Sequence, residues 1–104
     1  MKISIIIPVY NEQDSIKSLI KSLSKLVDNE IKQNWEIILI DDGSTDKSLE
    51  ALQIEVTGFS NMKIIQLQRN YGQTAAISSG IDNATGDILV TMDADLQNDP
   101  SDIP

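Results

Sequence analysis

Apolar segments that read as buried strands alternate along this chain with segments of helical period, and this alternation constrains the fold most. Four stretches have strand character: 3–9, 35–40, 62–67 and 87–92. Three stretches of helical period lie between them: 16–27, a second that is capped within 44–46 and ends at Gly58, and 72–84, which is rich in small residues. Strand–helix–strand units of about 30 residues join parallel strands through right-handed crossovers. The pattern therefore predicts an α/β fold.

The size of the chain indicates one domain. With 104 residues it can form a single compact core, and we expect a Rossmann-like, mostly parallel sheet with helices on both faces. No apolar run approaches the roughly 18 residues needed to cross a bilayer. A turn-rich stretch, 98–104, follows the last strand, so one face and one edge of the sheet would be poorly covered. We expect residues 1–104 to be the truncated, N-terminal part of a longer protein.

Composition and charge exclude several classes of function. The chain has no cysteine and no histidine, which excludes disulfides, thiolate metal sites, a histidine base and imidazole-bound zinc. Eight basic and sixteen acidic residues give a net charge of -8, so no nucleic-acid partner is expected. From Asn70 to Pro104 there are six aspartates and no basic residue. A site for anionic phosphates in such surroundings would need a divalent cation.

Polar clusters follow three of the four predicted strands, where ligands bind in open α/β sheets. They are Pro-Val-Tyr-Asn-Glu at 8–12, Asp-Asp-Gly-Ser at 41–44 and Asp-Ala-Asp-Leu-Gln at 93–97. Because the carboxyl ends of parallel strands meet at one edge, we expect these clusters to share one rim. No glycine-rich phosphate loop follows the first strand, which disfavours dinucleotide oxidoreductases and P-loop enzymes.

Asp93, Asp95 and Gln97 are spaced two apart, so in extended backbone their side chains project to the same side. Two carboxylates about 6–7 Å apart repel by roughly 2–3 kcal/mol, and a bound cation would turn this repulsion into attraction. Carboxylate and amide oxygens suit Mg²⁺ or Mn²⁺. A solvated acidic turn is the alternative, and the spacing alone does not exclude it.

The other candidates also have structural interpretations. Asp41 and Asp42 either cap a turn or accept hydrogen bonds from a base or ribose. Tyr10 either packs at the end of a strand or stacks on a nucleobase. Arg69 either balances the acidic rim or contacts a phosphate, and we favour the structural role.

Taken together and in this order, the motifs resemble the donor-binding half of a family 2 glycosyltransferase with the GT-A fold. The resemblance covers essentially all 104 residues and is carried by 5–12, 40–46, 69–72 and 86–97. Within that family, residues 93–100 are most similar to enzymes that load a sugar onto a polyprenyl or dolichyl phosphate. The step Asn98-Asp99-Pro100 is longer than usual there, which concerns only the turn geometry.

The resemblance implies roles for particular residues. It assigns nucleotide-sugar binding to Pro8, Tyr10, Glu12, Asp41, Asp42, Asp93, Ala94 and Asp95. It assigns a metal ion, Mg²⁺ or Mn²⁺, to Asp93, Asp95 and Gln97. Catalytic residues would lie downstream of the metal motif, outside this chain, so we expect these 104 residues alone to turn over little or no substrate.

The implied reaction is an inverting transfer of a sugar from a UDP- or GDP-linked donor to a polyprenyl phosphate or a glycan. For the full-length protein it implies a place on the cytoplasmic side of a membrane, and it leaves a homo-oligomer open. A non-catalytic, metal-dependent nucleotide-sugar-binding module is the alternative from another class. A sugar-nucleotide pyrophosphorylase is disfavoured, because it would need a glycine- and arginine-rich loop after the first strand, which residues 8–12 do not form. A phosphoacceptor signalling domain is disfavoured, because its acid pair would follow the first strand, whereas here the pair follows the second.

Overall fold

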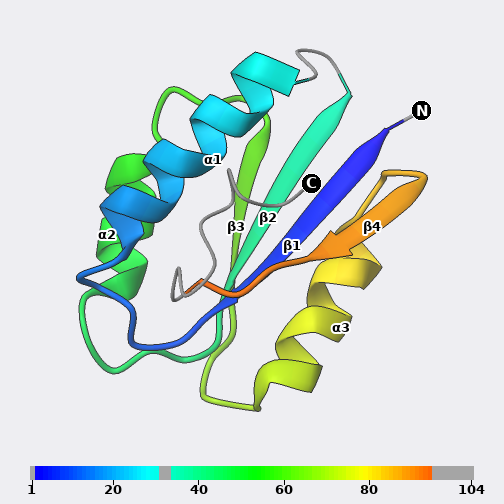
Figure 1. Cartoon of the computed structure of the whole chain (residues 1–104). Helices are drawn as coiled ribbons and strands as arrows, with labels where there is room; N and C mark the ends of the chain where they lie inside the picture. Colours follow the sequence, from blue (N-terminus) through cyan, green and yellow to red (C-terminus); the bar gives the residue numbers. More distant parts are fainter. Residues whose placement is uncertain (1, 31–33, 95–104) are drawn as a thin grey trace.

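The computed structural model describes residues 2–30 and 34–94, which form an α/β fold around a four-stranded parallel sheet (Figure 1). Its strands are β1 (Ile3–Val9), β2 (Trp35–Asp41), β3 (Met62–Gln66) and β4 (Ile88–Thr91). Its helices are α1 (Ile16–Glu30), α2 (Ser48–Glu55) and α3 (Gln73–Asn83). The predicted alternation is confirmed, and no strand bound differs from the prediction by more than one residue.

Helices cover both faces of the sheet, as predicted. α1 and α2 lie on one face and α3 on the other (Figure 1). Side chains alternate along β1, so Ile5 and Ile7 belong to the core under α1, while Ile6 belongs to the core under α3. Since both faces are covered, β1 reads as a continuous apolar run rather than an alternating one.

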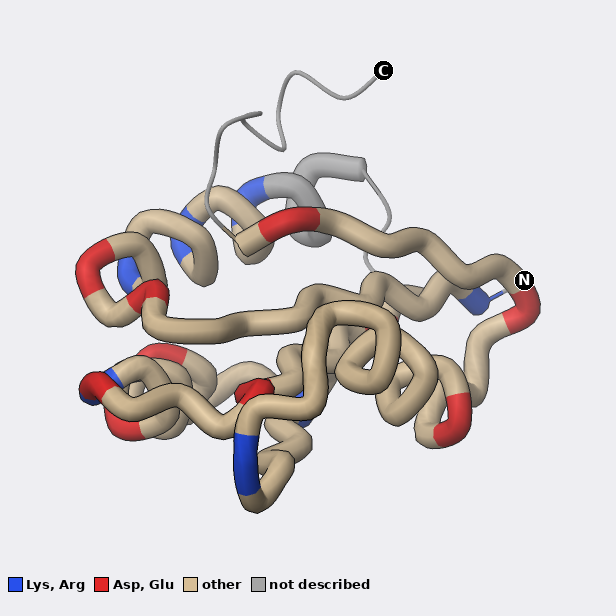
Figure 2. The backbone as a smooth tube through the Cα atoms, turned by 90° about the horizontal axis from the view of Figure 1, so that it is seen from below, with Lys and Arg blue, Asp and Glu red and all other residues tan. Residues whose placement is uncertain are grey.

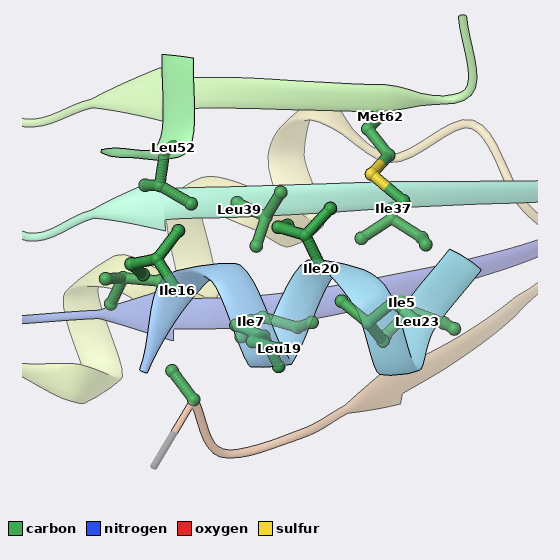
Figure 3. Close-up of a cluster of buried hydrophobic side chains, with 12 residues drawn as sticks. Ile5, Ile7, Ile16, Leu19, Ile20, Leu23, Ile37, Leu39, Leu52 and Met62 are labelled. Atoms are coloured by element: carbon green, nitrogen blue, oxygen red, sulfur yellow. The ribbon is translucent and has the colours of Figure 1, made fainter. Parts of the chain in front are cut away.

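The larger core lies between the sheet and helices α1 and α2. α1 presents buried apolar residues at steps of three and four, the period of a helix with one core-facing side. Figure 3 shows these residues lying over the strands: Ile16, Leu19, Ile20 and Leu23. Each fully buried leucine or isoleucine contributes about 1.5–3 kcal/mol relative to exposure. This packing fixes the end of β1, from which one side of the candidate site extends.

The strand order β3-β2-β1-β4 determines where a ligand can bind. From β1 the chain proceeds through α1 and α2 to β2 and β3 on one side, and α3 then returns it to β4 on the other side of β1. The order of the sheet therefore reverses between β1 and β4. In open α/β sheets, ligands bind beyond the carboxyl ends of the strands at such a point.

β4 is an edge strand, and all four of its residues are exposed. Ile88, Leu89 and Val90 are 42%, 45% and 38% exposed, respectively. The sheet thus has an apolar edge in the part of the chain that the structure describes. Across residues 2–30 and 34–94, no helix has both the length and the apolarity to cross a bilayer.

Candidate functional site

A cavity of about 520 Å³ opens at the carboxyl ends of β1 and β4. Small-molecule sites commonly measure about 300–1,000 Å³. Its walls come from all three polar clusters and from the segment before α3: Pro8, Val9, Tyr10, Glu12, Asp42, Asn70, Gly72, Gln73, Asp93 and Ala94. Six of the eight residues predicted for nucleotide-sugar binding therefore lie around one cavity, at the point where the strand order reverses.

Asp41 does not line this cavity. In the alternation of β2 it shares the face of Ile37 and Leu39, which is covered by α1 and α2, and it is only 2% exposed. Its Oδ1 atom is buried without a hydrogen-bond partner among the described residues. Of the adjacent pair, Asp42 therefore lies at the cavity, whereas Asp41 lies on the face of β2 that α1 and α2 cover.

Of the three predicted metal ligands, the structure places only Asp93. Its Oδ1 atom lies 3.5 Å from Nε2 of Gln73, another cavity residue, which donates a weak hydrogen bond to it. Asp95 and Gln97 lie outside the described residues. Within the described ranges, no group of three acidic side chains gathers in a way that could hold a metal ion. The metal site therefore stays a prediction.

Asp42 accepts hydrogen bonds from three groups of the segment before α3, and the residue is 3% exposed. Its Oδ1 atom accepts from the backbone N–H of Tyr71 at 2.9 Å. Its Oδ2 atom accepts from the N–H of Gly72 at 3.1 Å and from Nδ2 of Asn70 at 3.2 Å. The same Nδ2 atom also donates to the Asp42 carbonyl at 3.2 Å. These bonds hold residues 70–72 against the end of β2.

Gly43 allows the two segments to approach this closely. Its φ is +68°, and a Cβ built there would overlap the backbone of Arg69 and Asn70, lying 2.6 Å from the Cα of Arg69. Any larger residue at this position would push the segment away and would also be strained by the positive φ. The loop after β2 therefore packs backbone to backbone against residues 69–70.

Arg69 lies over the ring of Tyr71, with 5.0 Å between its Cζ atom and the ring centroid. This is the geometry of a cation–π contact. In the part of the chain described by the structure, it forms no ion pair with an acidic residue, so it does not balance the acidic rim by direct pairing. Figure 2, which views the molecule from below, marks the acidic positions in red and the basic positions in blue along the described backbone; the whole chain has sixteen acidic and eight basic residues.

A second network joins the loops that follow β1 and β2. Asn11 has a φ of +51°, and its Oδ1 atom accepts from the backbone N–H groups of Thr45 at 2.8 Å and Asp46 at 3.3 Å. The N–H of Asn11 donates in turn to Oγ of Ser44 at 3.0 Å. Burial would raise the pKa of Asp46, but hydrogen bonds from Ser48 and from the backbone of Gln13 lower it below its usual value. These contacts fix the loop that carries Tyr10 to the cavity.

Asn70, Gly72 and Gln73 are cavity residues that the strand-end reasoning did not single out. They follow β3 by several residues, so the rule that polar clusters directly follow strands does not reach them. The signal that was available is the motif 69–72, which contributed to the family resemblance without a role being assigned to it.

Comparison with known proteins defines the family. The profile of glycosyl transferase family 2 matches residues 4–104. The chain therefore belongs to glycosyl transferase family 2, as its motifs predicted.

Two curated relatives are the undecaprenyl-phosphate 4-deoxy-4-formamido-L-arabinose transferases of Salmonella choleraesuis (strain SC-B67) and Salmonella newport (strain SL254). Each is 47% identical to this chain over 105 residues. The match covers 99% of this chain and 32% of each relative. The chain thus spans about a third of the length of these relatives.

Several solved structures share the fold. TarS 1–349 of S. aureus superposes with a TM-score of 0.80 and 31% identity, covering 91% of this chain and 28% of that one. The same protein in complex with UDP-GlcNAc gives a TM-score of 0.77. The mannosyltransferase PcManGT from Pyrobaculum calidifontis, in complex with GDP-Man and Mn²⁺, gives 0.82 at 23% identity, covering 90% and 27% of the two chains. This last likeness concerns the fold alone. The predicted GT-A architecture is confirmed.

Proposed function

We propose that this chain is the donor-binding part of an inverting glycosyltransferase that transfers a sugar from a nucleoside-diphosphate sugar to a polyprenyl phosphate. The observation that carries the proposal is the cavity at the reversal of strand order, lined by residues from all four stretches that carry the family resemblance. Relatives named as undecaprenyl-phosphate sugar transferases support the acceptor. Catalytic residues would belong to the part of the whole protein that this chain does not contain.

The lining of the cavity suits the nucleoside and the diphosphate of a nucleotide sugar. Tyr10 is 44% exposed and offers an aromatic face on which a base can stack. Pro8 and Glu12 would complete the nucleoside side of the pocket. Asp93 and Ala94, at the end of β4, would lie beside the ribose and the phosphates. In this proposal Asp42 belongs to the same nucleoside side.

A divalent cation is proposed because no lysine or arginine is among the described residues that line the cavity. Among its described lining residues, Glu12, Asp42 and Asp93 are acidic and none is basic. A diphosphate would therefore meet carboxylates rather than lysine or arginine. We propose that Asp93, Asp95 and Gln97 hold Mg²⁺ or Mn²⁺, whose hard-oxygen preference fits this donor set. When bound, the ion would neutralise charge on the departing nucleoside diphosphate.

The acceptor places the whole protein at a membrane in this proposal. Undecaprenyl phosphate is a lipid, and its phosphate is already ionised near neutral pH, so its oxygen needs less help from a general base than a sugar hydroxyl would. The cytoplasmic side is part of the same proposal and rests on the family resemblance. A glycan acceptor and a homo-oligomer remain secondary proposals.

Calorimetry of this chain with UDP and GDP, in Mn²⁺ and in EDTA, tests the donor site. We expect dissociation constants between about 1 μM and 1 mM in Mn²⁺, and little binding in EDTA. Asp95→Ala should abolish the metal-dependent part. Asp82→Ala, which removes an exposed carboxylate of α3, is the matched control and should bind like the unmodified chain. Nucleotide binding that is indifferent to EDTA and to Asp95→Ala would contradict the proposed site.

Transfer itself is tested in the full-length protein that contains these residues. Incubation with a labelled nucleotide sugar and undecaprenyl phosphate should move label into the lipid fraction. Full-length protein that binds donor in a metal-dependent way but transfers to neither a lipid phosphate nor a glycan would support the non-catalytic module instead.

A further inference from the structure

We infer that Glu36 is a positioning residue for the cavity, although it lies near the opposite ends of the strands. Together with Ser4 it holds the turn that precedes β4, and β4 in turn places Asp93 at the cavity. The inference rests on the proposed nucleotide-sugar site and adds to it a residue that does not touch the ligand. The competing role for Glu36 is a contribution to the stability of the fold and nothing more.

β4 is a short edge strand whose own side chains do little to fix its position. All four of its residues, Ile88–Thr91, are exposed, so no side chain of the strand is buried in a core that would resist a slip along β1. Within the described part of the chain, its backbone pairs with β1 alone. The contacts at the two ends of β4 therefore determine where the strand lies.

The end of β4 at the cavity carries Asp93. The N–H of Met92 donates to the carbonyl of Ile6 at 3.0 Å, and Ala94 is buried in the core under α1. Asp93 lies between these two residues and lines the cavity. A slip of β4 by one residue would turn Asp93 away from the cavity, because neighbouring residues of a strand face opposite sides.

The other end of β4 follows a turn that buried polar groups of β1 and β2 hold. The N–H of Thr85 donates to Oε2 of Glu36 at 2.9 Å, and the N–H of Gly86 donates to Oγ of Ser4 at 2.9 Å. The hydroxyl of Ser4 donates in turn to Oε2 of Glu36 at 2.6 Å. Ser4 and Glu36 are 0% and 3% exposed. A buried network whose members are hydrogen-bonded to one another is rigid, so the turn has a fixed place relative to β1 and β2.

The charge of Glu36 makes it a stronger anchor than a neutral side chain would be. Lys63 of β3 forms an ion pair with it at 2.5 Å, and this partner compensates the buried charge. Hydrogen bonds to an ionised acceptor are about twice as strong as those between neutral groups. The turn before β4 is therefore tied, through Glu36, to both strands that lie on the other side of β1.

β4 passes the position of the turn on to the cavity. Asp93 follows Thr85 by eight residues, which is about 26 Å of extended chain at 3.3 Å per residue. The cavity is lined by Pro8 and Tyr10 from the end of β1 as well as by Asp93 and Ala94. Its shape therefore depends on how far β4 is displaced along β1, and the turn sets this displacement.

Gly86 provides a second way to move the same turn. A Cβ built at this position would lie 2.8 Å from the backbone nitrogen of Ser4 and 3.0 Å from the carbonyl oxygen of Lys2. Gly86→Ala therefore pushes the turn away from β1, while Glu36 and Ser4 keep their side chains and the cavity lining is unchanged. If Glu36 acts through the turn, this variant should reproduce the effect of Glu36→Ala.

The experiment measures amide hydrogen exchange by NMR and nucleotide binding by calorimetry on the unmodified chain, Glu36→Ala and Gly86→Ala, each shown to be folded by circular dichroism. The N–H of Met92 bonds to β1 at 3.0 Å, and the N–H of Leu67, just after β3, bonds to β2 at 2.9 Å. We expect the ratio of Met92 exchange to Leu67 exchange, without nucleotide, to rise about tenfold in both variants. We expect affinities for UDP and GDP, in Mn²⁺, to fall about tenfold in both, because the site is less well preorganised.

Two control variants separate position from stability. Ile20→Ala removes a buried side chain from the core between α1 and the sheet (Figure 3) and leaves the network of Glu36 unchanged. It should destabilise the whole fold, yet the exchange ratio should not rise, and the folded chain should bind nucleotide like the unmodified one. Glu50→Ala removes an exposed carboxylate of α2 and should alter neither quantity.

Three results would overturn the inference. The first is an unchanged exchange ratio in Glu36→Ala and Gly86→Ala, and the second is an unchanged nucleotide affinity in chains whose ratio has risen. The third is an equal loss of affinity in Ile20→Ala, since stability alone would then explain it. If Glu36→Ala does not fold, Ser4→Ala, which removes the acceptor of the Gly86 N–H, takes its place. If the unmodified chain binds neither nucleotide, the proposed function fails, and the exchange ratio alone decides whether Glu36 positions β4.

Discussion

The hydroxyl of Ser4 donates a 2.6 Å hydrogen bond to the buried carboxylate of Glu36 on the neighbouring strand. The two residues pair directly across β1 and β2, near the ends of the strands that lie away from the cavity. Glu36 also accepts from the N–H of Thr85 at 2.9 Å and forms an ion pair with Lys63 at 2.5 Å. One carboxylate thus joins three strands and the turn that precedes β4.

This network predicts a dependence of stability on pH. Burial would raise the pKa of Glu36, but hydrogen bonds from Lys63, Ser4 and Thr85 outweigh it and lower the pKa from 4.5 to about 2. Because the folded pKa lies below the unfolded one, the stabilisation is fully present above the unfolded value and is lost as the pH falls towards about 2. The shift corresponds to about 3 kcal/mol. Urea unfolding between pH 7 and pH 2 measures it.

Glu36→Gln tests whether this residue is the cause. The variant removes a buried charge that accepts hydrogen bonds from Ser4, Thr85 and the half-exposed Lys63. Because hydrogen bonds to a charged group contribute about 1.5–3 kcal/mol, the variant should be less stable at pH 7, and its stability should vary less with pH in the acid range. Glu50→Gln makes the same change at an exposed position of α2 and should retain the slope of the unmodified chain. A variant at Glu36 that kept the full slope would show that other carboxylates cause it.

Gly80 is predicted to be required for the packing of α3 on the sheet. A Cβ at this position would lie 2.5 Å from Cγ2 of Ile6 and 2.8 Å from Cδ1 of Ile40. Although alanine favours helix more than glycine does, overpacking of a core costs about 1–3 kcal/mol. We therefore expect Gly80→Ala to lower the free energy of unfolding in urea. Ser78→Ala, exposed on the same helix, should not lower it, and a stabilised Gly80→Ala chain would contradict the close approach.

The sequence predicted the elements of the fold well because each has a plain physical signal. Ile5, Ile6 and Ile7 are continuously apolar because both faces of β1 are covered. The period of α1 is evident because only one of its sides meets the sheet. The strand order β3-β2-β1-β4 was not part of the prediction. The strand order depends on which face of the sheet α3 crosses and on which side of β1 the strand β4 pairs. The local periodicity of the sequence carries no information about either.

The site was predictable where a residue directly follows a strand. Tyr10 and Asp93 lie at the cavity because the ends of β1 and β4 are neighbours. Asp41 and Asp42 were not distinguishable, since adjacent residues at the end of a strand point to opposite faces and the last paired residue decides which one meets the cavity. The role of Asn70 depends on hydrogen bonds to Asp42, a long-range contact that no spacing in the sequence reveals.

Asn11 is predicted to be necessary for the hydrogen-bonded contact between the loops that follow β1 and β2. Alanine would leave the N–H groups of Thr45 and Asp46 without the Oδ1 acceptor and would hold a non-glycine residue at a φ of +51° without the local hydrogen bonds that favour it. We expect Asn11→Ala to lower the free energy of unfolding by about 1–3 kcal/mol. Asn11→Asp keeps an acceptor in place and should recover most of the loss in urea unfolding. Equal losses in both variants would contradict the role of the side-chain oxygen.

The exposed edge of β4 is predicted to limit the solubility of this chain. Its Ile88-Leu89-Val90 run has no charge and no proline, and an unprotected edge strand is a template for pairing with another chain. Leu89→Lys places a charge on that edge, where a lysine is a common protection against pairing, and it should reduce self-association in sedimentation velocity at increasing concentration. Ile54→Lys makes the same change in charge at a residue of α2 that is 69% exposed. Because it lies away from the edge, it should leave self-association nearly unchanged; equal effects of the two variants would mean that net charge, and not the strand edge, controls association.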